Sequence, residues 1–304
     1  MKLIYYSLAT PGGSACDQQW IQSIRSLRRH NSRIPVHLAL YDSAPEAILW
    51  EARRWNVTVH YLGSYPEYLD SLYLRGRLLA SYPTFHKFLS LHHLPLGEVS
   101  QVLFLDCDTF FFADIEALFD FHQSHHWYAR EEPASARSYL EPDPFHIDEN
   151  ALDAIVRAEG LRPIFPFNSG VFLLNHGLWN ALEPLRIPYL DFAWRLLMGQ
   201  QLAPVPERSS WDVELQRSVL SAATAYDHAR ALHYPSRNHW IIEEIALWLT
   251  LGHVPGLSQG LLSRDLVAQN GEFRDVLRPG GGCVAVHYFN SQETDFFSTV
   301  GLLG

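Results

Sequence analysis

The stretch QVLFLDCDTFFFADIEAL, residues Gln101–Leu118, determines how the rest of the chain is interpreted. Its apolar run Val102–Leu105 has the length and composition of a buried parallel strand. Asp106 and Asp108 follow directly, and Asp114–Glu116 indicates the start of a helix. Carboxylates at the end of a buried strand are costly unless a cation or hydrogen bonds compensate them. Because open α/β sheets bind ligands at the carboxyl ends of their strands, the segment predicts a ligand site there.

The composition is that of a globular protein. The chain has 304 residues, of which 47% are hydrophobic and 18% charged, so it can bury a substantial core. A formal net charge of −10 argues against a nucleic-acid backbone as the main partner, although one divalent cation could still hold an anionic substrate. Three distant cysteines favour a reducing compartment over a disulfide framework. The sequence shows neither a cleavable leader nor an apolar run of membrane-span length, so a soluble, cytoplasmic protein is expected.

Strand-like and helix-like segments alternate through the first sixty residues. Strands are expected at Lys2–Thr10, Ile34–Tyr41 and Val57–Leu62, and helices at Asp17–His30 and Glu46–Trp55. This order implies right-handed crossovers and a mostly parallel sheet, and therefore an α/β fold.

The remainder of the chain continues the alternation without an internal repeat or a linker that would divide it. Helical character is expected at Leu69–His93, Asp191–Leu202, Trp211–Ala222 and Glu243–Leu251. Further strands are expected at Val171–Asn175 and Cys283–Phe289, and the acidic, proline-bearing stretch Glu131–Asp148 is expected to be a surface loop that could cover a site.

Asp106 and Asp108 are the first candidate site residues. If the strand continues to Asp108, the two carboxylates point to the same side, because alternate residues of a strand share a face. Their oxygens suit Mg²⁺ or Mn²⁺, which keep coordination positions open for phosphates. In a simpler interpretation one aspartate caps a turn and the other is solvated. The D-x-D pattern is short, and its position after a buried strand is what favours a cation site.

Two later segments offer further polar groups. Asn168-Ser169-Gly170 is expected to be a turn entering an apolar strand, with an amide, a hydroxyl and a glycine that permits close backbone approach; a plain tight turn is the alternative. His287 lies in the last expected strand. A histidine in such a place is more often a core residue, but it could be a third ligand for the same cation.

These three segments, in this order, resemble the nucleotide-sugar glycosyltransferases of the GT-A fold, particularly glycosyltransferase family 8. The matching motifs are LFLDCD, NSGVFLLN and VAVHYF, and the resemblance covers nearly the whole chain. It implies a GT-A fold with a Rossmann-like, mostly parallel central sheet flanked by helices. It also implies a single domain over residues 1–304, with a nucleotide-binding half at 1–165 and a donor-sugar and acceptor half at 166–304.

The resemblance implies metal-dependent transfer of a hexose from a nucleoside-diphosphate sugar, most simply a UDP-sugar, to an acceptor hydroxyl with retention of configuration. Mn²⁺ or Mg²⁺ would be bound by Asp106, Asp108 and His287. The nucleotide would contact Tyr5, Ser7, Ala9, Thr10, Lys87, Asp106 and Cys107, and Asp42 after the second strand is a further candidate. The donor sugar and acceptor would contact Lys87, Asn168, Ser169, Gly170 and Asp212. For Lys87, an ordinary solvated lysine is the alternative.

Family 8 also uses an acidic or amide pair at the start of a later helix. Glu243-Glu244, with a glutamate in place of the amide, is favoured as the catalytic pair; Asp212 in Trp211–Gln216 competes with it. The alternative for Glu243 and Glu244 is an exposed acidic helix start favoured by the helix dipole. The family's late lysine after the histidine is absent, and three arginines could replace its charge: Arg237, Arg264 and Arg278.

Two other functions compete with the transferase. A haloacid-dehalogenase-like phosphatase would use Asp106 as nucleophile, but Phe110 stands where that class has threonine or valine. A catalytically inactive sugar-nucleotide- or carbohydrate-binding protein is the third possibility, since 13% of the residues are aromatic and could stack on sugars. The sequence contains neither the dinucleotide-binding fingerprint nor a P-loop.

Overall fold

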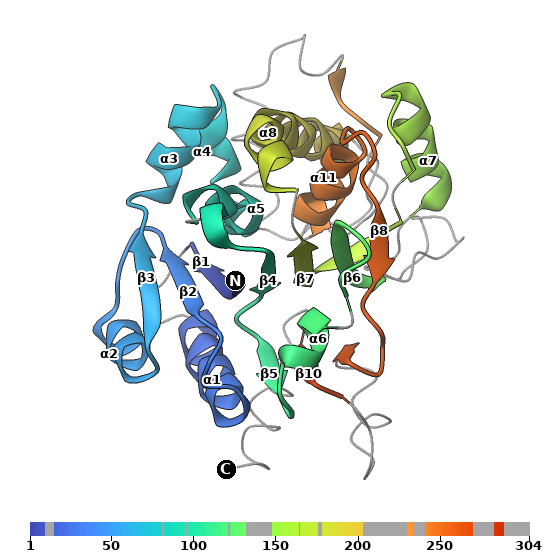
Figure 1. Cartoon of the computed structure of the whole chain (residues 1–304). Coiled ribbons are helices and arrows are strands. Elements are labelled where there is room, and N and C mark those ends of the chain that lie inside the picture. Colours follow the sequence, from blue (N-terminus) through green and yellow to red (C-terminus); the bar gives the residue numbers. More distant parts are fainter. Residues whose placement is uncertain are drawn as a thin grey trace.

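The structure is a computed structural model, and its described residues are 1–9, 15–80, 82–94, 96–120, 122–131, 148–163, 165–175, 178–202, 230–233, 241–269 and 283–288. Figure 1 shows its elements. The strands are β1 Lys2–Leu8, β2 Val36–Leu40, β3 Val57–Tyr61, β4 Gln101–Leu105, β5 Thr109–Phe111, β6 Trp127–Glu131, β7 Phe167–Asn175, β8 Gln259–Leu261, β9 Val267–Gln269 and β10 Ala285–His287. The α-helices are α1 Ala15–His30, α2 Glu46–Arg54, α3 Tyr65–Leu72, α4 Gly76–Leu79, α5 His86–Ser90, α6 Glu116–Asp120, α7 Glu149–Ala158, α8 Trp179–Leu202 and α11 Ile242–Leu251. Short 3₁₀ helices lie at Pro83–Phe85, Leu91–His93 and Leu96–Glu98.

The strands form two sheets in the described part of the chain. The larger is seven-stranded in the order β3-β2-β1-β4-β7-β6-β8. Strands β1 to β4 pair in parallel, as do β6 and β8, whereas β7 is antiparallel to both of its neighbours. The predicted α/β fold with a mostly parallel sheet is confirmed. The smaller sheet, β5-β10-β9, pairs the strand that follows the D-x-D motif with the last described strand.

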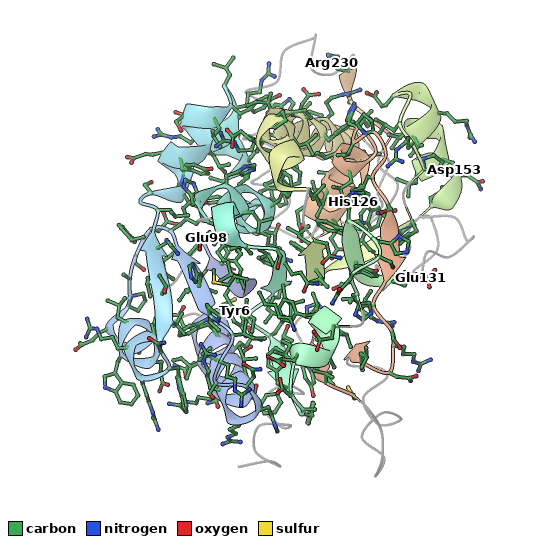
Figure 2. The ribbon with its side chains drawn as sticks, in the orientation of Figure 1. Tyr6, Glu98, His126, Glu131, Asp153 and Arg230 are labelled. Atoms are coloured by element: carbon green, nitrogen blue, oxygen red, sulfur yellow. The ribbon has the colours of Figure 1, made fainter. Side chains whose placement is uncertain are left out.

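Successive side chains of β1 point to opposite faces of the large sheet, and each face is covered by a hydrophobic cluster. Leu3 and Tyr5 lie in the cluster that also contains residues of α3, α5, α8 and α11, while Ile4 and Tyr6 lie in the cluster with α1 and α2. Figure 1 shows these two groups of helices on opposite sides of the row of strands, and the side chains of Figure 2 fill the space between. Tyr6 packs edge-on against Trp20 of α1, with ring centroids 6.4 Å apart. Burial on both faces explains why β1 and β4 are apolar without alternation.

The first five elements agree with the sequence prediction to within a few residues, but the helical segment expected at Leu69–His93 is broken. A Cβ at Gly76 would lie 2.0 Å from the carbonyl oxygen of Leu69, so the turn between α3 and α4 requires glycine. Pro83 then begins a 3₁₀ helix before α5. Helix α5, which carries Lys87, is therefore a separate short helix.

Helix α8 begins at Trp179, well before the expected start at Asp191. Pro184 and Pro188 lie inside it, and prolines normally end a helix because they lack the N–H donor. Packing of α8 against α11, with Leu185 and Tyr189 both buried, favours continuation of the helix through these positions.

Several expectations fall outside the described residues. These are Thr10, the helix expected at Trp211–Ala222 with Asp212, residues 132–147 of the expected surface loop, Phe289, Arg237 and Arg278. Glu131 itself ends β6, and Asp148 caps α7 by accepting a hydrogen bond from Ala151 N at 3.1 Å. Among the helices that are described, none has both the length and the apolar character needed to cross a membrane.

Candidate active site

The D-x-D motif lies in a turn. Strand β4 ends at Leu105 and does not continue to Asp108. The two aspartates therefore do not share the face of a strand, which would have required the strand to continue to Asp108. Asp106 N donates to Gly170 O at 2.7 Å, and Thr109 N donates to Asp106 O at 3.2 Å, which turns the chain into β5. The two carboxylates approach each other through this turn.

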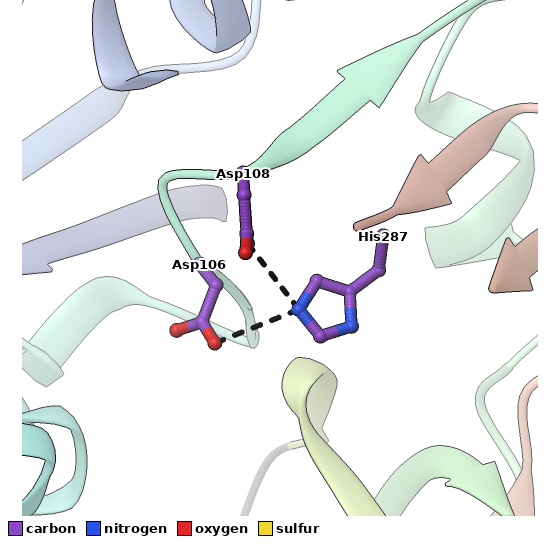
Figure 3. A group of neighbouring side chains, drawn as sticks. All are labelled: Asp106, Asp108 and His287. Carbon is purple, nitrogen blue, oxygen red and sulfur yellow. Dashed lines mark ion pairs between the residues drawn. The ribbon is translucent and has the colours of Figure 1, made fainter. Parts of the chain in front are cut away.

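His287 reaches the two aspartates because β10 pairs with β5. His287 lies opposite Thr109 in the antiparallel ladder, and Tyr288 N donates to Asp108 O at 3.1 Å. The imidazole Nε2 is 3.3 Å from Asp108 Oδ1 and 3.7 Å from Asp106 Oδ2. Figure 3 marks these two ion pairs with dashed lines. One ligand atom from each of the three residues lies within 4.8 Å of the others. The expected meeting of these residues around one point is therefore present.

The charges of this trio suit a divalent cation. Burial disfavours a charged His287, but the Asp108 and Asp106 carboxylates outweigh it and raise the pKa of His287 to about 10. Burial likewise opposes ionisation of Asp106, yet Lys87 and His287 lower the pKa of Asp106 to about 2. Asp108 Oδ1 is buried and has no hydrogen bond within the described ranges, only the ion-pair contact with His287. Two carboxylate oxygens and an imidazole nitrogen fit Mn²⁺ or Mg²⁺, which would take the place of the His287 proton.

Asn168-Ser169-Gly170 is part of a strand and does not form the expected turn. All three residues lie within β7, where the ladder with β6 shifts register between Ala129 and Arg130. A Cβ at Gly170 would lie 2.1 Å from His287 Cε1. Gly170 is thus required by the close approach of the His287 ring to the strand backbone, which a sequence-based turn assignment does not reveal.

Replacing Gly170 by alanine is expected to displace the His287 ring and weaken Mn²⁺ binding by about 10- to 100-fold, the usual cost of losing support for a ligand. Calorimetric titration with Mn²⁺ measures this. Gly97→Ala is the matched control, because a Cβ at Gly97 meets no atom within 4 Å and should leave Mn²⁺ affinity unchanged. Equal affinities for both variants would contradict the role of Gly170.

Lys87 occupies the centre of a second polar cluster beside the trio. Its Nζ donates to Asp106 Oδ2 at 2.7 Å, to Glu243 Oε1 at 2.9 Å and to Ser169 Oγ at 3.2 Å. The side chain is only 12% exposed, so the alternative of a solvated surface lysine is wrong. Burial lowers the pKa of a lysine, but the surrounding carboxylates raise the pKa of Lys87 well above its ordinary value. Lys87 is therefore a permanent positive charge between the D-x-D turn and α11.

Glu243 and Glu244 begin α11 and are both buried. Ser169 Oγ lies 2.7 Å from Glu243 Oε1 and 3.1 Å from Glu244 Oε1, and Ser169 N donates to Glu244 Oε1 at 3.1 Å. Asn168 Nδ2 is 3.4 Å from the same Glu244 oxygen. Burial raises the pKa of Glu243, and Lys87 offsets part of that increase. The alternative of an exposed acidic helix start is wrong for this pair.

The other positions proposed for the nucleotide lie in β1 or directly after it. Tyr5 is fully buried, with its ring 5.9 Å from that of Phe104, so it belongs to the core. Ser7 forms a hydrogen bond with His86 Nδ1 at 2.6 Å, and Ala9 is 3% exposed. Ser7 and Ala9 lie at the carboxyl end of β1, where the nucleotide edge was predicted, and the contacts of these residues with a nucleotide stay a prediction.

Three other residues were candidates for contacts with the nucleotide or its diphosphate. Cys107 is partly exposed between the two aspartates, and Asp42 uses Oδ1 to accept from Tyr65 N at 2.9 Å. Arg264 is exposed between β8 and β9. His86 was missed by the sequence analysis; its position next to Lys87 was the only available signal.

Comparison with known proteins identifies the family. The sequence model described as glycosyl transferase family 8 matches residues 18–185, more than half of the 304-residue chain. The chain belongs to glycosyl transferase family 8. The match includes the D-x-D turn, Lys87 and Asn168-Ser169-Gly170, and it ends before Glu243, Glu244 and His287, which the tertiary structure adds to the same site.

Two solved structures with TM-scores above 0.5 show the fold of this family 8 chain, and a third is reported beside them. The galactosyltransferase LgtC in complex with donor and acceptor sugar analogs is 12% identical, with a TM-score of 0.51 over 99% of this chain and 96% of its own. An active-site mutant of LgtC is 11% identical, with a TM-score of 0.52 over the same shares of 99% and 96%. Mouse xyloside xylosyltransferase 1 in its apo form is 15% identical, with a TM-score of 0.45 over 96% of this chain and 98% of its own. No curated protein matches the sequence.

The protein is therefore a glycosyltransferase of the GT-A fold that uses a nucleotide sugar. Family membership also sets aside the haloacid-dehalogenase-like interpretation of Asp106, because the D-x-D segment lies inside the matched region.

Proposed function

We propose that this family 8 enzyme transfers a hexose from a UDP-sugar to an acceptor hydroxyl, with retention of configuration and with dependence on Mn²⁺ or Mg²⁺. The observation that carries the proposal is the convergence of Asp106, Asp108 and His287 within 4.8 Å, next to the buried cluster around Lys87. The chain would act as one domain, with residues 1–165 forming the nucleotide half and residues 166–304 the donor-sugar and acceptor half. The scarcity of cysteines supports a cytoplasmic location.

Asp106, Asp108 and His287 would hold the cation, which supplies Lewis-acid stabilisation of the charge on the departing diphosphate. Asp106 is shared between this group and Lys87, so the lysine would set the carboxylate's orientation and bring a second positive charge toward the donor. A positive charge that is already held in place can stabilise the negative charge that develops on the diphosphate without any rearrangement of the site. The contacts of Lys87 with Glu243 and Ser169 provide that restraint.

Glu243 and Glu244 would lie on the donor-sugar side and act at the anomeric centre. Their carboxylates are held by Ser169 and Asn168 of β7, so hydroxyl groups of a sugar would meet acceptors in fixed positions. The elevated pKa of Glu243 suits a group that exchanges a proton with a hydroxyl. Gly170 would leave room for His287, and Asp212 is proposed as a further acceptor-side residue on sequence grounds alone.

For the nucleotide, the proposed contacts are with the carboxyl edge of β1 and the D-x-D turn. Ser7, Ala9 and Thr10 end or follow β1, and Cys107 lies in the turn itself. Tyr5 would act indirectly, as the buried support of this edge.

A screen of UDP- and GDP-sugars for metal-dependent hydrolysis tests the proposal. Release of UDP from one UDP-hexose is expected with Mn²⁺ or Mg²⁺, and EDTA should abolish it. Turnover that persists in EDTA would show that the metal part is wrong, and turnover of GDP-sugars alone would show that the nucleotide is wrong. Tight UDP-sugar binding with neither hydrolysis nor transfer would instead favour the inactive binding protein.

A further inference from the structure

His86, the residue before Lys87, faces a different part of the site. Consecutive residues of an α-helix point about 100° apart. Lys87 extends to β4 and α11, whereas His86 Nδ1 lies 2.6 Å from Ser7 Oγ of β1. The His86 ring is also edge-on to Tyr65 of α3, with centroids 6.4 Å apart and an interplanar angle of 83°. The imidazole is thus held on two sides.

The ladder places this histidine at the end of the strands that precede the metal site. Tyr6 of β1 is level with Leu105 of β4, so Ser7 is level with Asp106, and on its other side Ser7 is paired with Ala39 of β2. His86 therefore lies between the D-x-D turn and the carboxyl ends of β2 and β3. If the diphosphate of a ligand binds at Asp106 and Lys87, a group attached to that diphosphate can extend toward β2 and β3. That group would then lie beside His86.

The protonation state of His86 defines which group it can recognise. Burial lowers the pKa of His86 to about 3, and the positive charge of Lys87 acts in the same direction. At neutral pH the ring is uncharged, with Nδ1 engaged by Ser7. Among the residues that the structure describes, Nε2 has no hydrogen-bond partner, and the residue is partly exposed. An uncharged ring nitrogen suits a hydroxyl, amide or carbonyl group and adds no charge for a phosphate.

We propose that His86, oriented by Ser7, is a specificity residue that hydrogen-bonds the nucleoside of the donor through Nε2. Ser7 is the positioning residue, because its contact fixes the ring that faces the ligand. This inference rests on the proposed use of a nucleoside-diphosphate sugar. It assigns to the nucleoside a contact that is independent of the cation.

Two substitutions distinguish the contributions of the two ring nitrogen atoms of His86 to binding. His86→Asn keeps a polar group near Nδ1, within reach of Ser7, and removes Nε2; His86→Gln restores an amide near the position of Nε2. Calorimetric titrations compare UDP with inorganic pyrophosphate, both with Mn²⁺. Loss of one net hydrogen bond predicts UDP binding weakened about 3- to 10-fold in His86→Asn, with recovery in His86→Gln. Pyrophosphate affinity should match the wild type in both variants.

Two further variants complete the test: Ser7→Ala removes the positioning contact, and a substitution of a histidine outside the site is the control. Ser7→Ala should weaken UDP binding less than His86→Asn does and leave pyrophosphate binding unchanged. His30→Asn, at the exposed end of α1, should change neither. Unchanged UDP affinity in His86→Asn, or equal weakening of UDP and pyrophosphate, would overturn the inference while the metal-dependent function stands. A wild-type protein that binds pyrophosphate and Mn²⁺ but no nucleoside diphosphate would overturn both.

Discussion

Replacing Asp108 by alanine should abolish sugar transfer and Mn²⁺-dependent UDP binding while the fold stays intact. Asp108 Oδ1 faces His287 Nε2 at 3.3 Å and is a buried oxygen without a hydrogen bond in the described chain. Removing it leaves the trio with one carboxylate and one imidazole, too few protein ligands for a hard cation that also binds a diphosphate. Mn²⁺ affinity should fall by more than about 100-fold, beyond the usual effect of losing a supporting residue.

The fold should survive this change because the turn is held by backbone atoms. Asp108 O accepts from Tyr288 N, and Thr109 N donates to Asp106 O, so neither contact needs the Asp108 side chain. Calorimetry measures Mn²⁺ and UDP affinity, and thermal unfolding in EDTA measures stability. Asp120→Ala is the control, since the Asp120 side chain is 55% exposed and its ion pair within the described residues is with Lys2 at the surface. Wild-type transfer by Asp108→Ala at the same Mn²⁺ concentration would contradict the metal assignment.

Lys87→Met is expected to abolish transfer and to lower the free energy of unfolding by about 3–5 kcal/mol, the cost of removing one partner from a buried ion pair. Asp106 and Glu243 would both lose the ammonium group with which they form ion pairs, and the Glu243 side chain is only 3% exposed. The sequence offers a matched control, since Lys2 and Lys87 are its only lysines. Lys2 is 28% exposed and pairs with a 55% exposed Asp120, so Lys2→Met should cost less than about 1 kcal/mol.

The deficit of Lys87→Met should depend on pH through Glu243. Burial already raises the pKa of Glu243 in the folded wild type, and loss of Lys87 removes the main opposing charge. A carboxyl whose pKa is higher in the folded state contributes stability below its unfolded pKa and loses that contribution as pH rises through the folded pKa. The variant should therefore be closer to the wild type at about pH 5 than at about pH 8 in chemical denaturation. A deficit that grows toward low pH would show that Glu243 is not the group left unpaired.

Local sequence pattern was sufficient for the amino-terminal half of the sheet and for the choice of motifs. Apolar runs predicted β1 to β4, and 3.6-residue periodicity predicted α1 and α2, because each signal comes from residues adjacent in the chain. The same local reasoning misassigned the Asn168–Gly170 segment as a turn, and it left open whether β4 continues to Asp108, whereas the strand ends at Leu105. In both places the backbone follows a hydrogen bond between distant segments, from Asp106 N to Gly170 O.

By itself, the sequence determined the α/β class, the family and the identity of the residues that could bind a metal. The resemblance also pointed to Lys87, Glu243 and Glu244, but only the tertiary structure decided that these side chains are buried beside the D-x-D turn and not solvated. Whether Lys87 is solvated or buried depends on α5, β4 and α11 packing together, since its partners Asp106 and Glu243 come from segments far apart in sequence. A lysine or glutamate has the same local pattern on a surface as in a buried cluster. Its charge acquires a function only where folding excludes water and supplies the opposite charge.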